Sequence, residues 1–245
     1  MTTSILLIKC GEVAPELRHS AGDYDAWFQR AVGGMDVSFT IVRPYLGEPL
    51  PKTWGQDAVW LTGAASSVRE RAPWMLAAAD WLGDAAGRGA PILGVCFGHQ
   101  LLGQAFGSEV VLNPNGRETG SVEVTLTPAG LADPLFRGLP ERLTVQATHQ
   151  DIVRETPAGA TLLAGNANTQ VQAFAIGKAV RAVQFHPELS VDGMRAVIDS
   201  RAALLEAEAV ARGQPPHQAV PRMREALRPT PAGAVLLANF LESFT

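Results

Sequence analysis

The chain has 245 residues, of which 47% are hydrophobic, and its formal net charge at pH 7 is −4. This size and apolar content are enough for the core of one large α/β domain. No block of Lys or Arg stands out, which argues against nucleic acid or an anionic membrane as a partner. Because we find no signal pattern, no membrane-length apolar run and only two cysteines, we expect a cytoplasmic protein without a disulfide framework.

The first half of the chain alternates strand and helix signals. Short apolar runs predict strands, and apolar residues at helical spacing predict helices. We expect strands over 5–9, 37–42, 58–61 and 91–95, and helices over 25–32, 74–86 and 100–106. This βαβ rhythm predicts a mostly parallel central sheet with helices on both of its faces.

The second half changes to short β runs and then to helices. Antiparallel or mixed strands are expected over 121–126, 143–147, 161–164, 171–176 and 180–185, with turns at 128–130 and 157–159. Helices are expected over 194–211 and 234–244, with a connector over 213–217. The prediction is therefore an α/β fold with a small antiparallel sheet and C-terminal helices. We expect one domain over 1–245, with a core over about 3–190 and a helical extension over about 191–245.

A cysteine stands where the strand over 91–95 runs into the next helix. Gly94 and Gly98 flank Cys96 two residues to either side, where a tight strand-turn-helix needs close backbone approach and torsions costly to a residue with a Cβ. This is the construction of a nucleophile elbow. The N-terminus of the following helix favours thiolate over thiol, so Cys96 is the candidate nucleophile.

A thiol nucleophile needs a base, and the base needs a group that fixes its tautomer. His186 ends a strand and is followed by Pro187 and Glu188. Proline holds the preceding residue extended, so Glu188 can return beside the imidazole and accept a hydrogen bond. The plainer interpretation is a histidine at a β-turn with a solvated glutamate.

The other titratable candidates have simpler interpretations. We expect His99, on the first turn of the elbow helix, to be a packing residue, and Cys10 to be a small buried thiol. His149 either lines the pocket or makes a structural hydrogen bond, and His19 and His217 are surface residues. No metal centre is expected, because Cys-x-x-His without a second close pair is a weak zinc pattern.

Acyl transfer also needs N–H donors for the oxyanion. The backbone N–H of Phe97 is one candidate, because an elbow aims this group at the developing charge. The second donor should come from another strand tip, and the loop that begins at Thr62 and Gly63 has small residues that leave amides open. An ordinary βα loop is the alternative interpretation of that segment.

The motif Gly-Val-Cys-Phe-Gly-His-Gln over 94–100, with His-Pro-Glu over 186–188, resembles the class I (triad) glutamine amidotransferases, and in particular stand-alone proteins similar to the glutaminase domain of GMP synthase. The resemblance implies a flavodoxin-like fold, no cofactor, and hydrolysis of the glutamine γ-amide through a γ-glutamyl thioester. It implies that Cys96 is the nucleophile, His186 the general base and acid, and Glu188 its orienting partner.

The same resemblance implies a substrate site and an oxyanion loop. Gly63 or Ala64 would supply the second oxyanion donor, although alanine stands here where the family's second glycine is usual. The amino-acid end of the substrate would be held by Gln100, Thr148, His149, Gln150 and Asp151.

Two other functions stay open at this point. Some relatives with the same triad are γ-glutamyl peptidases, which differ only in the leaving group, and a non-catalytic binding module is a third hypothesis. The expected partner is glutamine or another γ-glutamyl compound. Any ammonia acceptor would be on a separate synthetase subunit, because the helical C-terminal stretch is too short for a synthetase domain.

Overall fold

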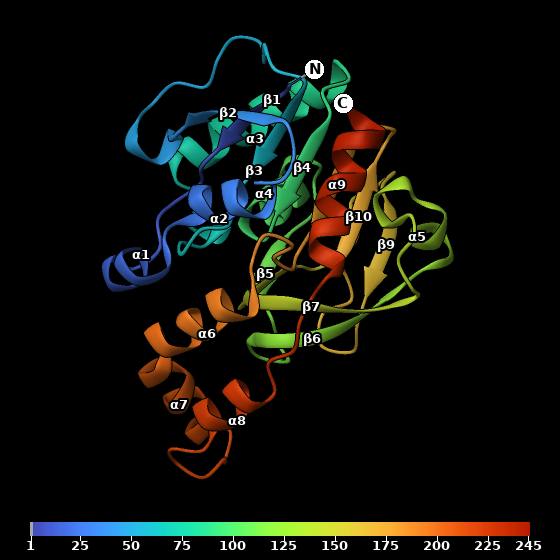
Figure 1. Ribbon diagram of the computed structural model, residues 1–245. Coiled ribbons are helices and arrows are strands. Elements are labelled where there is room, and N and C mark those ends of the chain that lie inside the picture. Colours follow the sequence, from blue (N-terminus) through green and yellow to red (C-terminus); the bar gives the residue numbers. More distant parts are fainter. Residues whose placement is uncertain (1) are drawn as a thin grey trace.

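The computed structural model describes residues 2–245, in which nine strands form one sheet (Figure 1). In sheet order they are β2 (Val37–Val42), β1 (Thr3–Ile8), β3 (Ala58–Leu61), β4 (Ile92–Val95), β11 (Val180–Val183), β10 (Ala173–Ile176), β9 (Thr161–Gly165), β6 (Glu118–Leu126) and β7 (Arg142–His149). The strands from β2 to β11 are parallel, and those from β11 to β7 are antiparallel. The mostly parallel sheet expected for the first half of the chain is confirmed.

The antiparallel strands extend this sheet, and a separate small sheet is built from other residues. Two three-residue strands, β5 (Val110–Leu112) and β8 (Asp151–Val153), pair antiparallel. Neither strand was among the predicted β runs, because three residues are too few to establish an alternating pattern.

Helices cover both faces of the sheet. α2 (Tyr24–Ala31) and α9 (Ala232–Phe244) lie on one face, and α3 (Pro73–Gly87) and α4 (Phe97–Ala105) on the other. Strand β3 joins the two cores, because Trp60 packs near Phe28 and Phe240, at ring-centroid distances of 5.6 and 5.9 Å, while Val59 and Leu61 belong to the opposite cluster. This is the period of two expected for a strand buried on both faces.

Some helical expectations are corrected by the structure. The single helix expected over 194–211 is two helices, α6 (Val191–Ser200) and α7 (Ala202–Ala211). Arg201 separates them, because its φ of −108° and ψ of 12° depart from helical values. The turn expected at 128–130 lies in a short helix, α5 (Pro128–Ala132). Helices α1 (Pro15–Ala21) and α8 (Ala219–Glu225) and the 3₁₀ turns η1 (Pro44–Leu46), η2 (Val68–Glu70) and η3 (Pro134–Phe136) were not predicted.

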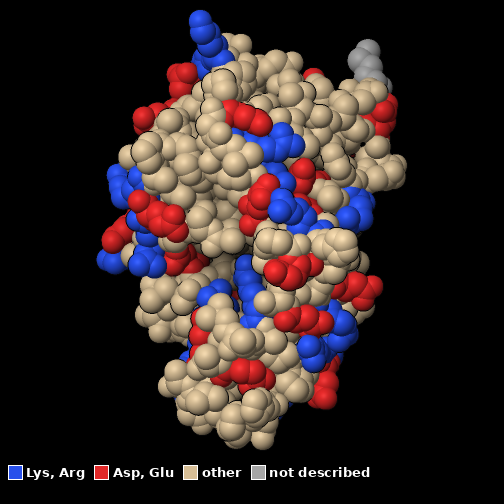
Figure 2. Space-filling view, turned by 90° about the vertical axis from the view of Figure 1, so that its left-hand side faces the viewer, with Lys and Arg blue, Asp and Glu red and all other residues tan. Residues whose placement is uncertain are grey.

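Helices α6, α7 and α8, which we call the cap (residues 191–225), project beyond the sheet (Figure 1). A third apolar cluster, which includes Leu17, Met194, Ile198 and Leu205, holds the cap to α1 and α2. After the cap, α9 returns to the sheet. Acidic and basic side chains are interspersed on the face in Figure 2. Within residues 2–245, no helix is long and apolar enough to cross a membrane.

Candidate active site

Cys96 occupies a strained turn between β4 and α4. Its φ is +53° and its ψ is −101°, a conformation that L-residues adopt rarely and that is concentrated at functional sites. The strain expected of Gly94 and Gly98 therefore falls on the cysteine, while the glycines supply space. A Cβ on Gly94 would lie 2.7 Å from the carbonyl oxygen of Gly98, and one on Gly98 would lie 2.5 Å from the Cβ of Leu61.

Sheet register brings His186 and Glu188 to the same edge as Cys96. Strands β4 and β11 are parallel neighbours with Val95 opposite Val183, so the residues that follow each strand emerge at one level. The Nδ1 of His186 lies 2.7 Å from the Oε1 of Glu188, and both side chains are buried. The interpretation of this motif as a surface turn with a solvated glutamate does not hold.

The electrostatic surroundings of His186 favour its charged form. Burial alone would lower the pKa of His186, but the charges of Glu188 and Cys96 outweigh burial and raise that pKa to about 10. An imidazole beside both a carboxylate and a thiol is therefore protonated at neutral pH. This arrangement matches a thiol nucleophile paired with its base.

The loop after β3 lies against the histidine. A Cβ on Gly63 would lie 3.0 Å from the Cε1 of His186 and 2.9 Å from the Cε1 of Tyr24, so only glycine fits between these rings. The carbonyl of Thr62 accepts a hydrogen bond from the N–H of Gly98 at 3.2 Å, which ties this loop to the elbow. Within residues 2–245 the N–H groups of Gly63, Ala64 and Phe97 donate to no acceptor, so they are free for an oxyanion.

A cavity of about 310 Å³ opens onto the thiol. The five residues expected to hold the substrate all line it, together with Cys96, Phe97 and Ala64; they are Gln100, Thr148, His149, Gln150 and Asp151. Gln100 is buried, and its Nε2 donates to the carbonyl oxygen of Asp151 at 2.8 Å and to the Oε1 of Gln184 at 3.1 Å. The cavity is therefore a preformed recess beside the Cys96 thiol, of the size of a small-ligand site.

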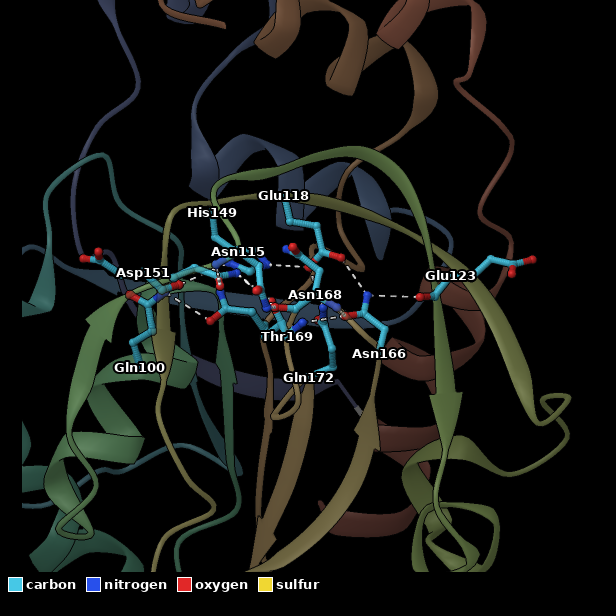
Figure 3. Close-up of polar contacts among 12 residues, drawn as sticks. Gln100, Asn115, Glu118, Glu123, His149, Asp151, Asn166, Asn168, Thr169 and Gln172 are labelled. Atoms are coloured by element: carbon cyan, nitrogen blue, oxygen red, sulfur yellow. Dashed lines mark hydrogen bonds and ion pairs between the residues drawn. The ribbon is translucent and has the colours of Figure 1, made fainter. Parts of the chain in front are cut away.

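A polar network connects residues that line the cavity, among them His149 and Asp151, with Glu118 and its neighbours (Figure 3). Glu118, at the start of β6, accepts hydrogen bonds from His149 at 3.0 Å, Gln172 at 2.7 Å and Asn166 at 2.6 Å. Burial opposes ionisation, but these hydrogen bonds and the charge of His149 lower the pKa of Glu118. The Nδ1 of His149 lies 3.1 Å from the carbonyl oxygen of Asp151, also an acceptor, so both contacts are hydrogen bonds only when His149 carries two protons. His149 thus lines the pocket and makes structural hydrogen bonds.

Three arginines also line the cavity and were missed in the sequence. Arg69 pairs with Asp151 at 3.0 Å, and Arg117 pairs with Glu208 at 3.0 Å. Arg201 donates to the Oγ1 of Thr148 at 2.7 Å. Arg117 and Arg201 belong to no motif, and Arg69 follows the expected oxyanion loop without a residue pattern of its own, so no local signal identified these three arginines.

The other four candidates are not among the residues that line this cavity. His99 is buried, its ring centroid is 4.8 Å from that of Phe174, and burial together with the charge of His149 lowers the pKa of His99 to about 3. Burial raises the pKa of Cys10 to about 12, as expected of an inert core thiol. His19 and His217 are exposed. The part of the chain that the structure describes contains no cluster of three or more His, Cys, Asp or Glu residues suited to a metal.

A family model described as glutamine amidotransferase class-I matches residues 22–199, which is most of the chain. The chain belongs to this family. The match contains the elbow, the His-Pro-Glu segment and the residues from 148 to 151, and it ends before α7.

Individual relatives agree with this assignment. The chain is 32% identical over 192 residues to the glutamine amidotransferase-like protein YfeJ of Salmonella typhimurium, covering 76% of this chain and 78% of that protein. It is 30% identical over 176 residues to a glutamine-hydrolysing GMP synthase subunit of Saccharolobus solfataricus, covering 71% and 88%. With the GMP synthase of Aeropyrum pernix it shares 36% identity over 144 residues, which are 59% of this chain but 26% of that enzyme.

Solved structures confirm the fold. The glutamine amidotransferase of Methylobacillus flagellatus superposes with a TM-score of 0.81 at 21% identity, over 100% of this chain and 96% of that one. A glutamine amidotransferase from Thermotoga maritima gives a TM-score of 0.73 at 22% identity, over 99% and 97%. The class I fold expected from the sequence motifs is therefore the fold of this chain.

Proposed function

We propose that this protein hydrolyses the γ-amide of glutamine through a γ-glutamyl thioester on Cys96. The observation that carries the proposal is the 2.7 Å contact between His186 and Glu188 at the strand end beside the strained Cys96 turn. A nucleophile on an elbow, a charged imidazole next to it and a carboxylate that orients the imidazole are the three parts of a covalent amidase.

The first half of the reaction forms the thioester. The Cys96 thiolate attacks the γ-carbonyl carbon, and the carbonyl electrons move to oxygen. As the tetrahedral intermediate collapses, the C–N bond breaks and the His186 imidazolium gives its proton to the leaving nitrogen, so ammonia departs. Glu188 holds the Nδ1 proton, which leaves Nε2 to face the reacting atoms.

The second half returns the enzyme to its starting state. Neutral His186 takes a proton from water, the hydroxide attacks the thioester carbon, and the C–S bond breaks. Glutamate leaves and the Cys96 thiolate is restored beside a protonated His186. In both halves the negative oxygen would accept hydrogen bonds from the free N–H of Phe97 and that of Gly63 or Ala64.

The proposed reaction releases ammonia and does not include a step that uses it. We propose that a separate synthetase subunit supplies the acceptor, because the Saccharolobus solfataricus relative is itself a subunit of GMP synthase. Glutaminase assays with and without a candidate partner would test this. Stimulation of turnover by a partner supports it, and a high unassisted rate for glutamine contradicts it.

The test of the thioester uses the two cysteines of the chain. Cys96→Ala should abolish glutamine hydrolysis and labelling by a glutamine-like chloroketone, whereas Cys10→Ala should retain both. Mass spectrometry should find one adduct, on the peptide that contains Cys96. Hydrolysis that persists in folded Cys96→Ala protein would sink the proposal.

The leaving group is tested separately. Turnover of L-glutamine should be compared with turnover of γ-glutamyl dipeptides and glutathione on the same preparation. A preference for glutamine supports the amidase, and a preference for the peptides would make the protein a γ-glutamyl peptidase with the same triad. An unlabelled and inactive protein would instead be a binding module.

A further inference from the structure

Of the three arginines that line the cavity, Arg201 is the one that has no anionic partner among residues 2–245. It lies at the junction of α6 and α7 and lines the same cavity as Cys96. Within residues 2–245, its side chain makes one hydrogen bond, from Nη1 to the neutral Oγ1 of Thr148, and pairs with no carboxylate. A guanidinium has five N–H donors, so most of its capacity is free.

The other two arginines of the cavity are already neutralised. Arg69 pairs with Asp151, and Arg117 makes three hydrogen bonds to the carboxylate of Glu208 and one to Gln150. An added anion would have to displace these carboxylates. At Arg201 it would meet a cation with no carboxylate to displace.

The position of Arg201 suits one end of a γ-glutamyl group. Its charge acts on Tyr24, where it opposes the rise in the pKa of Tyr24 that burial causes. The ring of Tyr24 lies against Gly63 and beside His186. Arg201 therefore brings a positive charge from the cap to the cavity that Cys96 lines, next to Thr148 at the start of the 148–151 segment. A γ-glutamyl substrate has an anionic α-carboxylate at the end remote from its γ-carbonyl.

We infer that Arg201 binds the α-carboxylate of the γ-glutamyl substrate and so restricts the enzyme to compounds with a free α-carboxylate. Guanidinium and carboxylate fit as a bidentate pair. Free glutamine and γ-glutamyl compounds meet this requirement, and glutamine within a peptide chain does not. The inference rests on the proposed function for its substrate.

Arg201 lies outside the part of the chain that the family model covers, since that match ends at residue 199. The family match therefore does not by itself account for this contact, which comes from the cap. The contact also assigns the cap a role, because two residues of the cap, Arg201 and Leu204, line the cavity together with Cys96.

The test pairs a change in the enzyme with a change in the substrate. Hydrolysis of L-glutamine and of L-glutamine α-amide, which lacks the carboxylate, is measured for wild type, Arg201→Gln and Arg201→Lys. Arg201→Gln should raise KM for glutamine by about 10–100-fold, the loss expected for charged hydrogen bonds, with a smaller effect on kcat. Its kcat/KM for the α-amide should stay within about 3-fold of wild type. Arg201→Lys should recover part of the loss.

Two further measurements keep the outcomes separate. Arg195→Gln, an exposed arginine on α6, is the matched control and should leave both substrates unaffected, with its melting temperature unchanged. Calorimetric binding of L-glutamine to Cys96→Ala protein, with and without Arg201→Gln, needs no turnover. If Arg201→Gln weakens both substrates equally, or leaves glutamine binding unchanged, the inference is wrong. If wild type binds glutamine through Arg201 but does not hydrolyse it, the proposed function fails and the inference stands.

Discussion

The backbone N–H of Cys96 donates to the carbonyl oxygen of Val183 at 2.9 Å. This hydrogen bond continues the parallel ladder of β4 and β11 by one residue past the end of β4. The hydrogen bond fixes the position of Cys96 along the strand direction relative to Val183, and His186 follows Val183 by three residues. The proposed nucleophile and its proposed base are therefore positioned by sheet register, which holds groups more firmly than loops do.

Glu188→Gln should impair catalysis without unfolding the protein. Because the carboxylate charge raises the pKa of His186, its loss should shift the His186 titration from about 10 to a lower pH. We expect kcat to fall by about 10²–10⁴-fold, the range seen when a triad acid is neutralised. Glutaminase kinetics and NMR titration of the histidine ring would measure the two effects.

The control for this prediction is Glu225→Gln, an exposed carboxylate on the cap. It should alter neither kcat nor the titration of His186. A Glu188→Gln protein that keeps full activity and an unshifted His186 would show that Glu188 is not its partner.

Gly98→Ala should damage the elbow, because the new methyl carbon would lie 2.5 Å from the Cβ of Leu61 and 3.0 Å from its carbonyl oxygen. Overpacking of this kind costs about 1–3 kcal/mol. Gly83→Ala is the matched control: it lies in α3 with nothing within 4 Å of the new carbon. It should be stabilising by about 0.5–1 kcal/mol. Urea unfolding of both variants would decide, and equal stabilities would contradict the prediction.

Glu118→Gln should loosen the wall of the pocket. The added amide N–H₂ would face donors from His149, Gln172 or Asn166, and His149 would lose its negative partner. We expect a loss of about 2–4 kcal/mol in unfolding free energy and a higher KM for glutamine. Glu123→Gln, an exposed carboxylate on the same strand, should change neither value.

The lowered pKa of Glu118 also predicts a pH dependence. A carboxyl group whose pKa is lower in the folded state stabilises the protein above its unfolded pKa, and this stabilisation is lost as pH falls through the folded value. The stability difference between wild type and Glu118→Gln should therefore be present at neutral pH and shrink below about pH 4.5, the ordinary range of a glutamate. A difference independent of pH would be contrary to this expectation.

His99 should make the protein sensitive to acid. Its pKa is about 3 when folded, below the 6.5 of an exposed histidine, so the unfolded state binds more protons between these values. Stability from this group is fully present above pH 6.5 and is lost as pH falls toward 3, by up to about 1.4 kcal/mol per pH unit. His99→Met should flatten the pH dependence of unfolding by about one proton, measured by urea unfolding at pH 4, 5 and 7.

The parts of the fold that could be predicted are the helices and strands that are determined by their own local sequence. Strands β2 and β3 have the predicted bounds. Both are short runs rich in β-branched and aromatic residues, too short for a helix and bounded by loop residues. The break at Arg201 was not predictable, because arginine is itself a good helix former and no glycine or proline stands at the junction of α6 and α7. Strands β5 and β8 exist because they pair with each other, a long-range contact that leaves no local signature.

The candidate site divides in the same way. Cys96, His186 and Glu188 lie in compact motifs whose backbone geometry follows from glycine and proline. Glu118 and Arg201, in contrast, meet their partners only because the sheet and the cap fold together. The chain has 20 Lys or Arg and 24 Asp or Glu residues, 44 charged residues in all. The sequence around one of them does not indicate which other residue it will contact.

The last helix has a bearing on the order of biosynthesis. Gly233, in α9, packs so closely on the turn that carries the proposed base that a Cβ there would lie 2.3 Å from the carbonyl oxygen of Pro187. A chain leaves the ribosome from its N-terminus, so the turn at Pro187 is made well before the helix that supports it. The contact between α9 and the Pro187 turn can therefore form only after residues 232–244 have left the ribosome, later than the contacts between β4 and β11 that position Cys96.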